Sequence, residues 1–140
     1  MVAYLDSSVL LQHVIRADER ISQVFGHEVV VSSELLEIEC MRVVHRYRMD
    51  GTLDDEGFLQ AKSRIARVLD SVSIIAMSTS VKRRAAEAFP VTVKTLDALH
   101  LSSALAYVDA RPGETLAVFS YDRGLNRCAS ALGFSTPFAT

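Results

Sequence analysis

The sequence predicts an α/β protein of three layers, in which a central, mainly parallel sheet lies between two layers of helices. Four short segments are apolar and rich in β-branched residues, as strands buried on both faces should be. Segments with helical periodicity separate them, and this alternation is typical of a parallel sheet covered by helices. The chain has 140 residues, a common length for one domain, so we expect a single domain over residues 1–140.

The predicted strands are too short for helices, and turn-forming or helix-capping residues bound them. Their apolar positions are continuous rather than alternating, which indicates burial on both faces. They are residues 2–5 (VAYL), 28–31 (EVVV), 72–75 (VSII) and 115–119 (TLAVF).

The predicted helices are marked by residues that begin and end helices. Ser and Asp side chains accept hydrogen bonds from the free amides of a first turn, and Thr52 with Asp55 forms a capping box. Pro90 and Gly133 follow segments that they end. The helices, in chain order, are residues 7–15, 18–25, 33–49, 52–69, 80–89, 95–108 and 122–132.

Composition limits the classes of partner. The formal net charge is −2, which argues against binding nucleic acid through bulk positive charge. Local arginines remain available, and the planar guanidinium suits phosphate. We therefore regard Arg42, Arg46 and Arg123 as possible contacts to a phosphate group, with a solvated helix face as the alternative for each.

No window has the roughly 18 uninterrupted apolar residues of a membrane span, and the N-terminus lacks the pattern of a signal peptide. Cys40 and Cys128 are the only cysteines, too few for a disulfide framework. We expect both to be reduced core residues of a cytoplasmic protein. No Cys/His cluster indicates zinc, and no glycine-rich loop indicates a nucleotide.

Two aspartates follow predicted strands. Asp6 comes directly after VAYL, and Asp122 lies beyond TLAVF. Because the carboxyl ends of parallel strands meet at one edge of a sheet, where sites form, we expect these two carboxylates to lie close together. Each has an equally good alternative role as a helix N-cap.

Glu39 lies inside a predicted helix, where no capping role explains it. Leu35, Leu36 and Val43 are its neighbours on the apolar face, where an unpaired glutamate is seldom found. The alternative is an ion pair with Arg42, three residues on.

Asp97 begins the helix KTLDALHLSSALA and shares a face with Leu101, although a first-turn acid would serve equally well. Four carboxylates brought together repel and raise one another's pKa. A hard divalent cation such as Mg²⁺ or Mn²⁺ relieves that conflict through oxygen ligands. We therefore expect that a metal ion compensates the charge of Asp6 and of the other three carboxylates.

The residues resemble the PIN-domain ribonucleases and, among them, the VapC-type toxins of prokaryotic toxin–antitoxin pairs. The resemblance spans essentially the whole chain, in the order of the family's motifs. The matching residues are Asp6-Ser7-Ser8, then Ser33, Leu35, Glu39 and Arg42, then LDALHLSSALA, then Ser120-Tyr121-Asp122, and the closing LNRCASALGF.

That resemblance implies that Asp6, Glu39, Asp97 and Asp122 are the catalytic, metal-binding acids, supported by Ser8 and Ser120. It implies Mg²⁺- or Mn²⁺-dependent hydrolysis of RNA of the tRNA or ribosomal RNA class, which inhibits translation. It also implies a homodimer and a cognate antitoxin protein, for which residues 7–15 and 52–69 are possible contact surfaces.

Other functions remain open on the residues alone. A nuclease that processes RNA without being a toxin, and a non-catalytic PIN module, share these motifs. A phosphatase or receiver-type phospho-acceptor would use Asp6, but Ser8 and Arg123 occupy positions where those families have Asp and Lys. Metal-independent cleavage would need an Arg/His pair, and Arg42 with His45 is too closely spaced. His100 is expected to be a satisfied structural residue.

Overall fold

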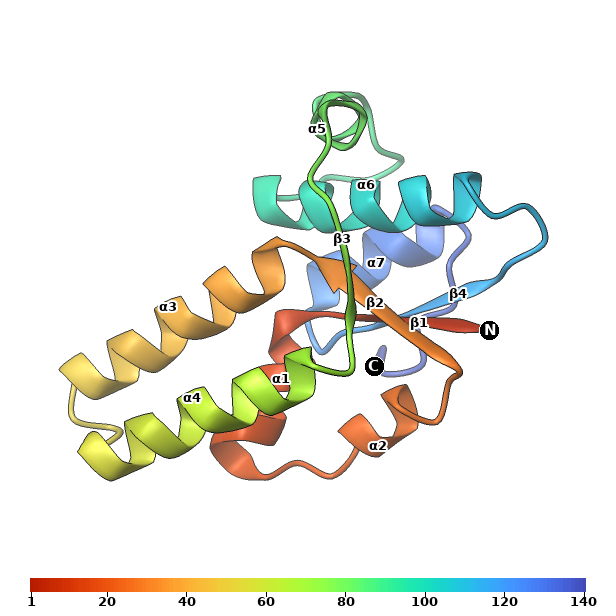
Figure 1. Ribbon diagram of the computed structural model, residues 1–140. Helices are drawn as coiled ribbons and strands as arrows, with labels where there is room; N and C mark the ends of the chain where they lie inside the picture. The colour runs from red at the N-terminus through yellow and green to blue at the C-terminus, as the bar shows by residue number, and fades with distance from the viewer.

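The predicted class is confirmed: a four-stranded, all-parallel sheet is covered by helices on both faces (Figure 1). The computed structural model describes residues 1–140. The elements in chain order are β1 (Val2–Leu5), α1 (Ser7–Arg16), α2 (Ile21–Val24), β2 (Val29–Ser33), α3 (Leu35–Met49), α4 (Asp55–Leu69), β3 (Ser73–Ile75), α5 (Thr79–Ala85), α6 (Thr95–Asp109), β4 (Leu116–Phe119) and α7 (Arg123–Ala131).

The strand order β3-β2-β1-β4 places β1 and β4 side by side. Leu5 pairs with Phe119 at the carboxyl ends of these two strands. Beyond β4, the amide of Val118 donates to the carbonyl of Ser135 over 2.8 Å, so the C-terminal segment covers that edge. The residues that follow β1 and β4 therefore emerge together.

The sheet separates two apolar cores, because successive side chains of a strand point to opposite faces. Ala3 and Leu5 of β1 pack with α1, α3 and α4, whereas Val2 and Tyr4 pack with α6 and α7. In Figure 1, α6 and α7 lie above the sheet and α1 and α2 below it, with the α3–α4 pair extending to one side. The strands β1 and β4 are buried throughout, as predicted, and β2 is buried except at Val29.

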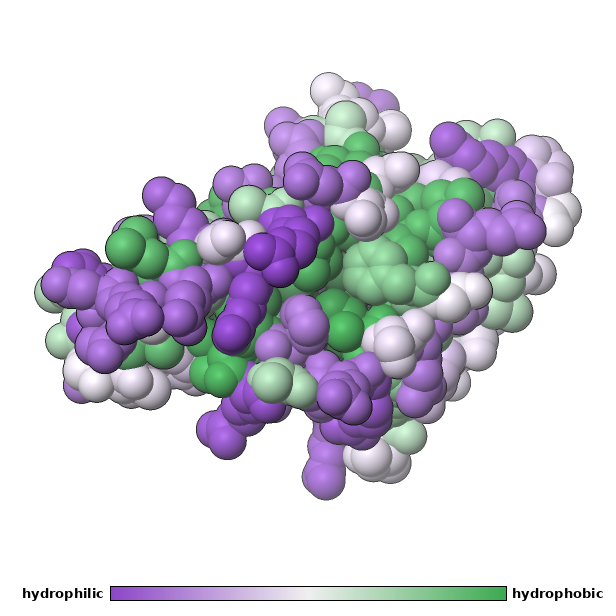
Figure 2. All heavy atoms as spheres, turned by 60° about the horizontal axis from the view of Figure 1, so that its bottom comes forward, coloured by the Kyte–Doolittle hydropathy of each residue, from purple (hydrophilic) through white to green (hydrophobic).

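The third strand corrects the expectation that every strand is buried on both faces. Ser73 and Ile74 of β3 are exposed, because β3 lies at the open edge of the sheet. Hydrophilic side chains cover much of the face shown in Figure 2, and an apolar area lies near its middle. Cys40 and Cys128 are buried free thiols, as expected. None of the helices combines the length and apolarity needed to cross a membrane.

Several predicted helix boundaries were wrong. Asp54, not Thr52, caps α4, because its Oδ1 accepts from the amide of Gly57 over 2.7 Å. Thr52 instead bonds to Asp50 in the preceding turn. Five helices are shorter than predicted: α2, α3, α4, α5 and α7 span Ile21–Val24, Leu35–Met49, Asp55–Leu69, Thr79–Ala85 and Arg123–Ala131. The helices α3 and α4 begin later than predicted, and α5 ends well before Pro90.

Candidate active site

Asp6 is a buried carboxylate at the end of β1, with only 5% of its surface exposed. Its Oδ2 accepts from the hydroxyls of Ser8 over 2.6 Å and Ser120 over 2.7 Å, and weakly from the amide of Ser8 over 3.4 Å. Burial of a charge is tolerated when such donors replace water. The second oxygen, Oδ1, has no protein donor and is available to a ligand.

The two serines connect the ends of β1 and β4. Ser120 follows β4, and its hydroxyl also accepts from the amide of Asp122 over 2.9 Å. Ser8 accepts from the amide of Tyr121 over 3.0 Å. Asn126 donates to the carbonyl of Ser120 over 2.8 Å and so holds α7 against the same turn. The structure therefore places both predicted supporting serines beside Asp6.

Asp6 and Asp122 are also helix N-caps, which is the alternative role expected for each from the sequence. Asp122 is the N-cap of α7 and accepts from the amide of Leu125 over 2.9 Å. Asp6 is the N-cap of α1. Each cap bond uses one carboxylate oxygen only, so capping fixes the side chain without occupying its second oxygen.

The expected alternative for Glu39, an ion pair with Arg42, is wrong. Glu39 Oε1 is hydrogen bonded instead to Nε2 of His100, whose side chain is completely buried. Nδ1 of His100 lies 2.6 Å from the hydroxyl of Tyr4. Both ring nitrogens are therefore satisfied, as expected for a structural histidine. Burial lowers the pKa of His100, but the bond to Glu39 and the charges of Asp6, Glu39 and Asp97 together raise it.

Asp97 lies in the first turn of α6, and its pKa reflects both its burial and the charges around it. Its pKa is raised from the usual 3.8 to about 6, first by burial and then by the negative charges of Asp122, Asp6 and Glu39, against a smaller opposing effect of His100. The negative charges of the other three predicted acids therefore all reach Asp97, although the four residues come from separate parts of the chain.

The arrangement fits a divalent cation bound largely through water. No three acidic, His or Cys side chains lie close enough to form a ready coordination shell. Mg²⁺ is usually held by one or two carboxylates together with several waters, so such a shell is not required. The free oxygen of Asp6 and the repelled carboxylate of Asp97 are hard oxygen donors whose mutual repulsion a cation would offset.

Arginines lie in two hollows that begin at this edge of the sheet. A pocket of about 210 Å³ includes Ser8 with Arg46 and Tyr121. A second pocket of about 520 Å³ includes Arg123 and Asn126. Arg42 is exposed on α3 and lines neither pocket. Other lining residues that the sequence did not single out for the site are Arg16, Tyr47 and Arg127.

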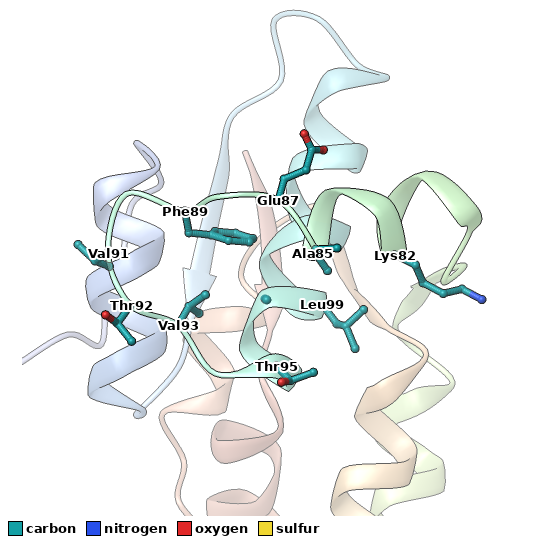
Figure 3. A pocket seen from close by; sticks show the side chains of 11 residues that line it. Lys82, Ala85, Glu87, Phe89, Val91, Thr92, Val93, Thr95 and Leu99 are labelled. Carbon is teal, nitrogen blue, oxygen red and sulfur yellow. The ribbon is translucent and has the colours of Figure 1, made fainter.

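A further pocket of about 520 Å³ lies between α5, the following loop and the start of α6 (Figure 3). Phe89 and Val93 extend from the loop toward α6, and Lys82 points outward. The lining is mainly apolar and contains none of the four acids. This pocket is therefore separate from the candidate site, although α6 borders both.

Ionisation of Asp97 should cost stability in the metal-free protein. Because its folded-state pKa lies above the usual value, the folded protein binds this proton more tightly, and stability falls as pH rises from about 4 to about 6. We expect Asp97→Asn to raise the free energy of unfolding by about 1 kcal/mol above pH 6, after allowance for solvent screening. Near pH 4 the gain should vanish. Urea unfolding at both pH values measures it.

Glu37→Gln is the control, because it removes an exposed first-turn carboxylate from α3 and should not stabilise the protein. A gain for Asp97→Asn that is the same at both pH values would contradict the electrostatic explanation.

Solved structures of similar fold include proteins from three organisms. VapBC2 from Rickettsia felis, bound to a DNA fragment from its promoter, has a TM-score of 0.68 at 12% identity, covering 97% of each chain. PAE2754 from Pyrobaculum aerophilum has a TM-score of 0.60 at 20% identity, covering 99% of this chain and 82% of the other. VapC20 from Mycobacterium tuberculosis, a sarcin-ricin loop cleaving toxin, has a TM-score of 0.54 at 14% identity, covering 94% and 95%.

No curated protein matches the chain in sequence. The family model of the PIN domain matches residues 3–130, which include all four acids and both supporting serines. The chain therefore belongs to the PIN domain family.

Proposed function

We propose that the chain is a divalent-metal-dependent endoribonuclease and the toxin of a type II toxin–antitoxin system. One observation carries this proposal: near the carboxyl ends of β1 and β4, burial and then the charges of Asp122, Asp6 and Glu39 raise the pKa of Asp97. A group of acids that destabilises itself in this way is typical of a functional site. We further propose that residues 1–140 form a single nuclease domain.

Asp6, Asp97 and Asp122 are the residues that would hold Mg²⁺ or Mn²⁺, each through an oxygen that no protein donor uses. Bound there, the cation lowers the pKa of its water and offsets the charge that develops on the phosphate. Ser8 and Ser120 keep Asp6 in one orientation through their hydroxyl bonds to Oδ2. The cap bond to Leu125 does the same for Asp122.

Glu39 has a different task in this proposal. One of its oxygens is bonded to His100, and its side chain is 21% exposed, so the other oxygen can face solvent at the site. A carboxylate in that position accepts a hydrogen bond from the attacking water and takes its proton. The water oxygen then forms a bond to phosphorus as the bond between phosphorus and the 3′ oxygen breaks. The leaving oxygen takes a proton from solvent, so that the products are a 3′-hydroxyl and a 5′-phosphate.

RNA would approach along the two arginine-lined pockets on either side of the acids. Arg46 and Tyr121 offer a guanidinium and a ring beside Ser8, and Arg123 borders the other pocket. None of these arginines is in an ion pair within the chain, so each can bind phosphate. Arg42 lies one turn before Arg46 on α3 and extends the same path.

The biological role rests on the similar folds. One neighbour is a VapBC toxin–antitoxin complex and another cleaves the sarcin-ricin loop, which is ribosomal RNA. These names support an antitoxin partner and a tRNA or ribosomal RNA substrate, whose cleavage in the cytoplasm would inhibit translation. We also propose a homodimer, since closed twofold assemblies are the commonest oligomers. The helices α1 and α4 are the surfaces we propose for partners.

Purified protein should cleave RNA only with Mg²⁺ or Mn²⁺, and a chelator should abolish the reaction. We expect Asp97→Asn to reduce the cleavage rate by at least about 10- to 100-fold, the loss caused by replacing even a residue that only orients the ligands of a metal site. Because this substitution should not destabilise the fold, an unfolding curve measured in parallel separates lost chemistry from lost structure. Full activity in a chelator would rule out the metal mechanism.

Removing the proposed phosphate contacts should weaken RNA binding without changing the chemical step. We expect Arg46→Ala and Arg123→Ala each to raise KM several-fold and to reduce the salt dependence of binding by about one ion. Arg83→Ala on α5 makes the same change in charge away from both pockets and should leave KM unchanged. Equal effects of all three substitutions would show that only net charge matters.

The toxin role predicts a phenotype. Expression of the chain alone should arrest growth of a bacterial host, and Asp6→Ala should relieve the arrest, because it removes the carboxylate on which Ser8 and Ser120 converge. Asp70→Ala removes an exposed carboxylate and should remain toxic. With expression levels matched by immunoblot, equal toxicity of the parent and Asp6→Ala would argue against a toxin.

A further inference from the structure

A chain of hydrogen bonds runs from the apolar core to the candidate site. The hydroxyl of Tyr4 lies 2.6 Å from Nδ1 of His100, and Nε2 of His100 is bonded to Oε1 of Glu39. Tyr4 and His100 are buried, at 1% and 0% exposed, whereas the Glu39 side chain is 21% exposed. The chain therefore ends at a carboxylate that solvent can reach.

The position of one proton in this chain does not depend on the charge of His100. An ionised carboxylate only accepts hydrogen bonds, so Nε2 of His100 carries a proton that it donates to Glu39. In the neutral ring, Nδ1 accepts from the hydroxyl of Tyr4. In the charged ring, Nδ1 donates to that oxygen instead. Either way, Tyr4 orients the ring and Nε2–H faces Glu39.

The same elements supply this chain and the acids. Tyr4 lies on β1 two residues before Asp6. His100 lies on α6 three residues after Asp97, so the two share one face of that helix. Glu39 lies on a third element, α3. The bond between His100 and Glu39 therefore fixes α3 relative to the two elements that carry Asp6 and Asp97.

We propose that His100 is a positioning residue, which holds the carboxylate of Glu39 in its reactive orientation while Tyr4 orients the imidazole ring. This inference rests on the proposed nuclease function. A glutamate side chain has three rotatable bonds, and a single fixed donor at Oε1 leaves Oε2 pointing in one direction. Partners of this kind, which orient residues at a metal site, are worth about 10- to 100-fold in activity.

Two substitutions at His100 test the proposal. Gln places an amide N–H near the position of Nε2, whereas Leu fills a similar volume without a donor. We expect His100→Leu to lower kcat by about 10- to 100-fold with KM unchanged, and His100→Gln to recover most of that loss. Tyr4→Phe keeps the packing and removes only the hydroxyl, so its loss should be smaller. Rates are normalised to the folded fraction from unfolding curves.

A double-mutant cycle with Glu39→Gln separates positioning from a purely structural role. If His100 acts through Glu39, adding His100→Leu to Glu39→Gln should change kcat less than about threefold, because the coupled effect is already lost. Effects that multiply in the double variant, or equal losses in His100→Gln and His100→Leu, would overturn the proposal. Should His100→Leu fail to fold, Tyr4→Phe and His100→Gln in the Glu39→Gln background give the same answer.

A spectroscopic measurement, which does not depend on activity, tests the contact between His100 and Glu39 directly. Nitrogen-15 NMR of the imidazole should show a proton on Nε2 at low field in the parent protein, shifted to higher field in Glu39→Gln. A signal that does not respond to Glu39→Gln would overturn this inference even if the protein cleaves RNA. If the parent protein shows the low-field signal, and that signal responds to Glu39→Gln, but the protein cleaves no RNA with any divalent metal, the proposed function is overturned instead.

Discussion

The parallel pairing of β1 with β4 is the constraint on which the candidate site depends. Their register sets Leu5 opposite Phe119, so that the next residue of each strand, Asp6 and Ser120, meet at the same edge. The hydroxyl of Ser120 donates to the buried carboxylate of Asp6 over 2.7 Å, so a residue that follows one strand stabilises a charge that follows the other. A shift of one residue between these strands would reverse which side chains face each core and would separate the pair.

The negative charges at this edge of the sheet reduce the stability of the fold, although they form the proposed site. Asp97 is repelled by three other acids and shielded from water, which raises its pKa to about 6. A fold selected for stability alone would have a neutral residue there. Asp6 and Asp122 offset part of the cost, because the same carboxylates cap α1 and α7 and satisfy amides that would otherwise lack partners. Helix capping and the proposed metal binding are thus compatible roles of one side chain.

His100 shows how a buried polar group can serve both packing and chemistry. Its ring contacts Tyr4 edge-on in the core, and both nitrogens are bonded, so the structural interpretation made from the sequence is correct. The partner at Nε2 is nonetheless an acid of the candidate site rather than a backbone carbonyl. This contact joins residues 61 positions apart along the chain, so no local pattern indicates it, although His100 and Asp97 share a helix face.

The class of fold followed from short-range patterns, because apolar runs of four or five residues and helical periodicity are properties of local segments. Helix ends were less predictable, since competing polar side chains such as Asp54 and Thr52 can each accept a first-turn amide, and only the folded backbone selects one. The exposed position of β3 at the edge of the sheet could not be predicted from the sequence either, because strand order depends on pairing between distant segments.

By itself, the sequence indicated the residues that we propose to carry the chemistry: four acids in unusual places, two of them at strand ends, and two serines beside them. Only the tertiary structure decided how those acids are held and how strongly they repel. Partner choice, as when Glu39 bonds to His100 rather than Arg42, depends on distances between elements that the chain brings together only on folding. Electrostatic energies vary with those distances and with burial, and neither is encoded in local spacing.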